Sequence, residues 1–292
     1  MAAPEDEVVR ATSGGGVAVR AMVGTKLVGE AIARHGLSPV ASVALGRALM
    51  GAALLAAGAE EGESVQLHFS GDGPLGGVTV IADGAGRARG TVGNPGATPP
   101  LQNGALDVAA GIGEGLLAVV RERPGWKSPH RGVVPLATGT VAQDIAHYLE
   151  RSEQTRSAVA LGVFLARHGG VEAAGGFFVS ALPGASESEI AQVEANVRGF
   201  PGPGKLVRAG LGAAEIVQHL LAGLGSGPFE RSRPTFHCPC ERQRALRTIA
   251  LLGRAELSRS TARGEALEMR CQFCGERYEI SDDEIGSLLP DA

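Results

Sequence analysis

Four cysteines are the residues of this chain whose types and spacing point most directly to chemistry. Cys238 and Cys240 form a Cys-Pro-Cys pair, and Cys271 and Cys274 form a Cys-Gln-Phe-Cys pair after 30 intervening residues. A zinc ion takes four thiolates in a tetrahedron, with Zn–S distances of about 2.3 Å. A Cys-x-x-Cys turn brings two sulfurs together, and residues two apart in extended chain lie on one face. The four side chains therefore predict one Zn²⁺ site per reduced chain.

The same four thiols leave other uses open. A thiolate is both a metal ligand and a nucleophile, so each pair could oxidise when the zinc leaves. The site could instead be an inert zinc ribbon that only folds a small domain. His237 adjoins Cys238 and could be an additional ligand, but four thiolates already fill a tetrahedral site. A thiol oxidoreductase would place its Cys-x-x-Cys at the start of a helix, whereas this pair falls between two expected strands.

Other patterns in the sequence carry little chemistry. Residues 111–115 (GIGEG) lack a P-loop lysine and lie outside any βαβ pattern. Residues 84–90 (GAGRARG) fall in an expected hairpin turn. The chain has no Gly-x-Ser-x-Gly motif and no clustered carboxylate pair. We therefore expect no catalytic residues and no enzyme activity.

Composition narrows the class of protein. The chain has 292 residues, of which 44% are apolar, enough for a sizeable core. A net charge of −4 disfavours a whole-molecule polyanion binder. Residues 1–10 are acidic and lack the apolar run of a secretory signal. Residues 40–59 are apolar but rich in alanine and glycine, and Arg47 would cost at least ~2.5 kcal/mol in a membrane. We expect a cytoplasmic protein without a membrane partner.

The residues before the cysteines predict an α+β fold in which an antiparallel sheet is packed against helices. We expect this N-terminal domain to span residues 1–183 and its first part, residues 14–60, to be helix-rich. Alternating and apolar runs bounded by turn residues predict strands, and helical periodicity predicts helices. The expected strands are 65–69, 78–82, 87–92, 116–121, 131–136 and 176–180, and the expected later helices are 140–150 and 153–167.

Residues 184–231 predict a helical linker without a core of its own. A capping box, Ser186-x-x-Glu189, opens one helix, and residues 205–224 form a second amphipathic segment. Both segments are short and glycine-rich, so their order must come from packing on the first domain. The apolar residues expected to make that contact are Ile190, Val193, Val197, Ile216 and Leu220.

Residues 232–292 predict a small domain that needs a metal or disulfide to supplement its core. We expect a helix at 242–252, two strands at 265–271 and 276–280 and a terminal helix at 282–289, capped by Ser281-x-x-Glu284. Residues 231–279 carry ten arginines and six glutamates. This excess of positive charge favours an alternative, a zinc ribbon that binds nucleic acid, but the segment lacks interleaved aromatic residues.

Taken together, these motifs resemble the heat-shock protein 33 family of redox-regulated holdase chaperones. The strongest matches are residues 236–242 (FHCPCER), 251–257, 269–274 (MRCQFC) and Tyr278. Further matches follow in the family's order at residues 45–47, 71–76, 148–154 and 174–177. The chain departs from the family's common pattern at Ser180, Glu241 and residues 130–132.

The resemblance implies an ATP-independent holdase that prevents aggregation of unfolding client proteins under oxidative or heat stress. Its reduced, zinc-bound form would be inactive. Oxidation would pair Cys238 with Cys240 and Cys271 with Cys274, release the zinc and free the linker from the first domain. A homodimer would accompany activation, and nucleic acid would not be a partner.

Overall fold

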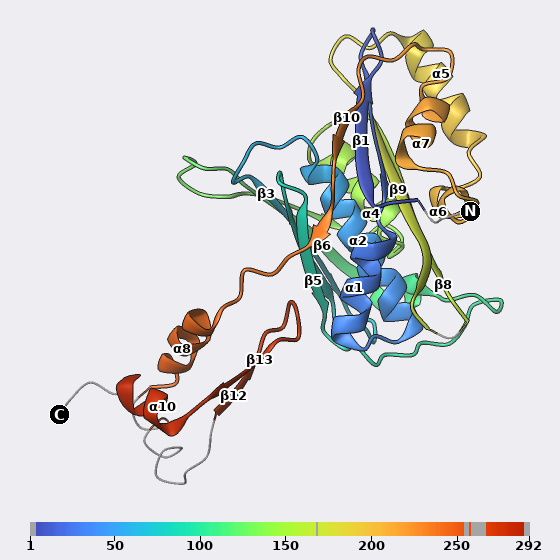
Figure 1. Ribbon diagram of the computed structural model, residues 1–292. Helices are drawn as coiled ribbons and strands as arrows, with labels where there is room; N and C mark the ends of the chain where they lie inside the picture. Colours follow the sequence, from blue (N-terminus) through green and yellow to red (C-terminus); the bar gives the residue numbers. More distant parts are fainter. Residues whose placement is uncertain (1–3, 168, 254–256, 258–266, 289–292) are drawn as a thin grey trace. The chain divides into compact units, whose positions relative to one another are not determined.

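The computed structural model describes residues 4–167, 169–253, 257 and 267–288, which divide into two compact units (Figure 1). The first unit is Met1–His237 and the second is Cys238–Ala292. The fold class predicted from the sequence, α+β with antiparallel sheets and a small four-cysteine unit at the C-terminal end, is confirmed. The sequence led us to expect one sheet in the first domain, but the first unit contains two.

The first sheet has five strands, all paired antiparallel in the order β10-β1-β2-β9-β8. The second has six strands in the order β11-β5-β4-β3-β6-β7, antiparallel except for the parallel pair β11–β5. The bounds of the first sheet's strands are Glu7–Thr12 (β1), Val17–Val23 (β2), Ser157–Leu165 (β8), Val171–Ala181 (β9) and Glu230–Ser232 (β10). Those of the second are Ser64–Gly71 (β3), Val78–Asp83 (β4), Arg87–Val92 (β5), Gly115–Glu122 (β6), His130–Pro135 (β7) and Thr235–Phe236 (β11).

Helix α2, Pro39–Ala56, forms the centre of the core between the sheets. Every residue of the helix except Pro39 and Arg47 is buried. Ser38 caps its first turn by accepting a hydrogen bond from the Ala41 N–H, and Arg20 Nη1 donates to the Leu54 carbonyl at 3.0 Å near its end. Its length and composition would suit a membrane span, but 89% of the span is buried inside the protein, as the sequence predicted. The other helices of this core are α1 (Thr25–His35), α3 (Val108–Ile112) and α4 (Ala142–Arg151).

Two glycine-rich segments hold each other in place beside α3. The backbone N–H of Gly73 donates to the Ile112 carbonyl at 2.9 Å, and Asp72 Oδ1 accepts from the Glu114 N–H at 2.9 Å. A Cβ at Gly71 would come within 2.0 Å of the Ile112 oxygen, so the close approach requires glycine. The glycines of residues 111–115 therefore serve the contact between segments rather than a phosphate site.

Two helical predictions in this unit are wrong. Residues 17–23 form strand β2 instead of helix, and most of residues 153–167 form strand β8. Both strands are covered on both faces: in β8, Val159 and Val163 contact the core around α2, whereas Ala160 and Phe164 contact the linker side. A strand buried on both faces has a continuous apolar run instead of an alternation, so its periodicity does not distinguish it from a helix.

Three linker helices cover the outer face of the five-stranded sheet (Figure 1). They are α5 (Glu187–Arg198), α6 (Pro203–Arg208) and α7 (Ala213–Leu220). The predicted capping box is present, because Ser186 Oγ accepts from the Glu189 N–H at 3.3 Å and Glu189 Oε2 accepts from the Ser186 N–H at 3.1 Å. The single segment expected at 205–224 is instead two helices, separated at Gly210, whose φ of +95° breaks the helix.

The second unit contains the elements expected from the sequence. They are α8 (Arg242–Ala250), β12 (Leu267–Arg270), β13 (Arg277–Ile280) and α10 (Asp282–Leu288). Residues 265, 266 and 289, which the sequence assigned to element ends, lie outside the described residues. The small core consists of Ala245, Ile249, Leu257, Ile280 and Ile285. So small a core supports the expectation that the unit needs a further constraint.

Candidate metal centre and linker surface

The four cysteines lie on two segments of the second unit. Cys238 and Cys240 precede helix α8, and Cys271 and Cys274 occupy the turn between β12 and β13. The turn is closed by the Cys271 N–H, which donates to the Glu276 carbonyl at 2.8 Å, and by Gly275, whose φ is +74°. Glycine tolerates this left-handed conformation, so the chain can reverse directly after Cys274.

The structure brings all four sulfur atoms together, every pair within 4.8 Å. The Sγ atoms of Cys238 and Cys271 are 3.7 Å apart, and those of Cys240 and Cys274 are 3.2 Å apart. Sulfurs at the corners of a Zn–S₄ tetrahedron lie about 3.8 Å apart, so these distances suit one central ion. Four soft thiolates without a carboxylate favour zinc over magnesium or calcium. The predicted ligands therefore fit a metal ion, and His237 is not part of the cluster.

The environment of the sulfurs differs from one cysteine to the next. Burial raises the pKa of the Cys238 thiol to about 11, and it also raises the pKa of Cys274 well above the usual range. Burial acts to raise the pKa of Cys271 as well, but hydrogen bonds from the backbone N–H groups of Phe273 and Cys274, together with those to the Cys274 and Cys238 thiols, outweigh it and lower that pKa. Without a cation, four thiolates this close would repel one another, so metal binding and deprotonation are linked.

Side chains around the cluster fix the segments that carry it. Tyr278 Oη donates a hydrogen bond to Cys240 Sγ at 3.2 Å, and this bond is the main cause of the raised pKa of the Tyr278 phenol. Arg242, at the start of α8, pairs with Glu284 at 2.7 Å and donates to the Glu279 carbonyl at 2.7 Å. Arg242 lowers the pKa of the Glu284 carboxyl to about 2. The start of α8 is thereby tied to β13 and α10.

The linker helices in the first unit cover an apolar face of β1, β2 and β9. Val193, Ile216 and Leu220 are buried against this face, as predicted, and Val197 is partly buried there. Phe200 packs edge-on against Phe177 of β9, with ring centroids 5.2 Å apart. Helix α7 is the most deeply seated of the three, since Ile216, Val217 and Leu220 have no exposed surface.

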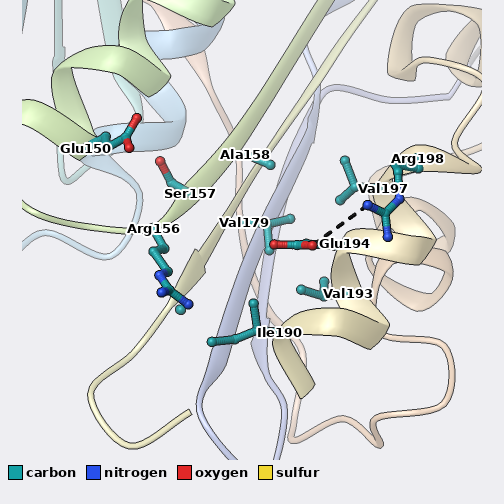
Figure 2. Close-up of a pocket in the computed structure, with 11 residues that line it drawn as sticks. Glu150, Arg156, Ser157, Ala158, Val179, Ile190, Val193, Glu194, Val197 and Arg198 are labelled. Atoms are coloured by element: carbon teal, nitrogen blue, oxygen red, sulfur yellow. Dashed lines mark ion pairs between the residues drawn. The ribbon is translucent and has the colours of Figure 1, made fainter. Parts of the chain in front are cut away.

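Helix α5 is seated less closely, because a groove of about 450 Å³ lies between it and strands β8 and β9 (Figure 2). Ile190, which we expected to be packed on the first domain, lines this groove and is only half-buried. Ala158 and Val179 form part of the apolar wall, and the Glu194–Arg198 ion pair lies at the rim with an N–O distance of 3.9 Å. Within the described residues, the buried Ser157 hydroxyl beside the groove has no hydrogen-bond partner.

The end of the linker is tied to both sheets immediately before the first cysteine. Strand β10 pairs with β1, where Arg10 forms an ion pair with Glu230 and Arg231 pairs with Glu7 at 2.6 Å. Strand β11 pairs with β5, and the Phe236 ring lies under the Arg34 guanidinium at 5.0 Å. We call residues 230–237 the strap. The sequence shows three charged residues in this segment, Glu230, Arg231 and Arg233, but it does not identify their partners.

A model of the Hsp33 protein family matches residues 6–281 of this chain. The chain belongs to the Hsp33 family. It is 40% identical over 292 residues to the 33 kDa chaperonin of Nostoc punctiforme, with 98% of this chain and 96% of that protein covered. The 33 kDa chaperonin of Thermus thermophilus is 41% identical over 295 residues, with 97% and 86% covered. The crystal structure of the 33 kDa chaperonin from Thermotoga maritima matches with a TM-score of 0.90 at 31% identity and covers 97% of both chains.

Membership of the Hsp33 family confirms the resemblance drawn from the motifs and places the chain among chaperones. It gives no support to the nucleic-acid-binding zinc ribbon. Several motifs that suggested Hsp33 have structural roles here. Tyr148 is fully buried, and Glu153 pairs with Arg121 at 2.9 Å, joining the segment after α4 to strand β6. The hydrogen bond from Tyr278 to Cys240 was not foreseen from the sequence, although the motif contained both residues.

Proposed function

We propose that this Hsp33-family member is a redox-regulated, ATP-independent holdase that binds unfolding proteins and prevents their aggregation. The observation that carries the proposal is the four-sulfur cluster, joined through the strap to a linker that covers a large apolar face. The cluster supplies a group that oxidants attack, and the covered face supplies a surface for unfolded chains. The proposed partners are unfolding client proteins and, on activation, a second copy of the chain.

In the reduced state we propose that Cys238, Cys240, Cys271 and Cys274 hold one Zn²⁺ per chain. The bound ion would keep the thiolates deprotonated and cross-link the segment before α8 to the β12–β13 turn. Five residues form the buried core in the part of the second unit that the structure describes, and with so small a core we propose that the unit depends on this cross-link for its fold. A folded second unit then anchors the end of the strap that follows β11.

Oxidation converts the four thiolates to two disulfides. We propose Cys238–Cys240 and Cys271–Cys274 as the pairs. Each pair of thiolates loses two electrons as its disulfide forms, so two hydrogen peroxide molecules are reduced to four hydroxide ions for each chain. The sulfurs then no longer hold the ion, and the two segments of the second unit can separate.

We propose three functional segments, an N-terminal chaperone domain at 1–183, a metastable linker at 184–231 and a redox-switch domain at 232–292.

Loss of the folded second unit would release the linker. Undocking of α5–α7 would uncover Val9, Val19 and Phe177 on the sheet, together with the apolar faces of the helices themselves. We propose that release of the linker needs no nucleotide. We propose that the protein acts in the cytoplasm and is not an enzyme.

A parallel titration tests the proposal. Reduced protein is treated with increasing hydrogen peroxide at elevated temperature while a chelating dye reports zinc release and light scattering reports aggregation of a heat-unfolded client. The proposal predicts that zinc release and suppression of aggregation rise together. Suppression that is equally strong in the reduced protein, or zinc release without suppression, would contradict it.

A further inference from the structure

Tyr278 places a hydroxyl group directly on one of the four sulfurs. Its Oη donates to Cys240 Sγ at 3.2 Å, and its ring packs against the small core of the second unit. In the β12–β13 ladder Tyr278 lies opposite Met269. The adjacent pair, Arg270 and Arg277, is the last one before the turn that carries Cys271 and Cys274. Strand β13 and the small core therefore hold the phenol ring in place, and this position keeps its hydroxyl within hydrogen-bond distance of Cys240 Sγ.

We propose that Tyr278 is a positioning residue that slows oxidation of Cys240 and thereby sets the oxidant threshold of the switch. The proposal rests on the redox function proposed above. A thiolate reacts through a lone pair on sulfur, and a hydrogen bond to that sulfur draws charge away from it. Partners outside the ligand set tune metal sites in the same way, by changing the electron density and orientation of the ligands.

The step that Tyr278 slows is the attack of the Cys240 thiolate on hydrogen peroxide. The sulfur bonds to one peroxide oxygen, the O–O bond breaks and hydroxide leaves, which gives the sulfenic acid Cys240–SOH. The Cys238 thiolate then attacks this sulfur, forming the S–S bond and expelling a second hydroxide. Two electrons pass from the two sulfurs to one peroxide. When Tyr278 donates to Cys240, that lone pair is less available for the first attack.

The test compares Tyr278→Phe with Met269→Leu in the full-length protein. Tyr278→Phe removes only the hydroxyl, whereas Met269→Leu changes packing opposite Tyr278 without altering a group that bonds to sulfur. We expect Tyr278→Phe to release zinc faster at a fixed peroxide concentration, by roughly 3- to 10-fold, as for loss of one hydrogen bond of ordinary net strength. Met269→Leu should release zinc at the wild-type rate.

A spectroscopic measurement separates tuning of the sulfur from general loosening of the hairpin. In protein loaded with Co²⁺, the sulfur-to-metal charge-transfer bands should shift to lower energy in Tyr278→Phe, because a thiolate without the hydrogen bond is a stronger electron donor. Met269→Leu should leave the bands in place. Peptide mapping at half-complete zinc release should also show a larger oxidised fraction of Cys240 in Tyr278→Phe than in wild type.

Two results would overturn the role of Tyr278. One is a wild-type rate of zinc release with unshifted bands in Tyr278→Phe. The other is an equal acceleration in Tyr278→Phe and Met269→Leu, which would make the effect one of hairpin packing. In either case a wild-type protein that still releases zinc and becomes active with peroxide would leave the proposed function intact. Failure of the wild-type protein to respond would contradict the proposed function itself.

Discussion

The Sγ atoms of Cys240 and Cys274 lie 3.2 Å apart, although the residues are 34 positions apart in the sequence. Cys238 and Cys271 are likewise close, at 3.7 Å. Close sulfur contacts in the reduced cluster thus join the Cys238–Cys240 pair to the Cys271–Cys274 pair, in addition to the contacts within each pair. The cluster joins the segment before α8 to the β12–β13 turn, and it adds to the ties that Arg242 makes to Glu284 and to the Glu279 carbonyl.

The first prediction concerns which sulfurs become bonded. We expect peroxide to give Cys238–Cys240 and Cys271–Cys274, because the partners stay two and three residues apart once the metal leaves, whereas the 30-residue segment lets the pairs separate. Peptide mapping under non-reducing conditions after peroxide treatment measures the pairing. Predominant Cys240–Cys274 or Cys238–Cys271 links would show that the reduced contacts, and not chain connectivity, decide the outcome.

Removing one ligand should unfold the second unit. In Cys274→Ser the site loses the thiol of its most buried cysteine, a residue that is 5% exposed. The variant should lose the folding free energy that a structural zinc supplies, about 10–16 kcal/mol in small zinc domains. Metal analysis should find well under one equivalent of zinc, and hydrogen exchange should show residues 238–288 unprotected. Full zinc content with a protected β12–β13 hairpin would contradict the ligand assignment.

A charge under helix α7 should undock the linker in the reduced state. Ile216 is fully buried against the sheet, so Ile216→Asp leaves an uncompensated buried carboxylate at a cost of at least ~3 kcal/mol. Ile190→Asp should act in the same direction but more weakly, because Ile190 faces the groove and is half-buried. The exposed Gln218→Asp on the same helix is the matched control. Holdase activity of the reduced variants should rank Ile216→Asp above Ile190→Asp, with the control inactive.

Filling the groove under α5 should have the opposite effect. Ala158 lies in the wall of the 450 Å³ space between β8 and α5, so Ala158→Leu can add apolar contact without displacing a neighbour. Cavity-filling changes of this kind commonly stabilise by about 0.5–2 kcal/mol. We expect stronger hydrogen-exchange protection of residues 187–198 and a higher peroxide concentration for half-activation. Unchanged protection together with an unchanged threshold would show that α5 docking does not limit activation.

Local patterns in the sequence predicted most of the site, and tertiary packing determined what was missed. The cysteine spacing was sufficient to predict that the four sulfurs cluster, and the Ser186–Glu189 capping box was sufficient to predict the start of α5. Strand β8 was missed because both its faces are apolar. The strap was missed because its partners are distant in the chain; Arg10 and Glu230, for example, are 220 positions apart. The groove under α5 follows from the fit of a helix to a sheet, which no local pattern encodes.

The central claim is that undocking of the linker exposes the chaperone surface. Hydrogen exchange of the full-length protein before and after peroxide treatment tests it most directly, with holdase activity measured on the same samples. The account predicts that residues 184–231 lose protection as activity appears, while strands β3, β4 and β5 between residues 64 and 92 keep theirs, since they lie in the core around α2. Full activity with α5, α6 and α7 still protected would contradict linker undocking as the event that exposes the chaperone surface.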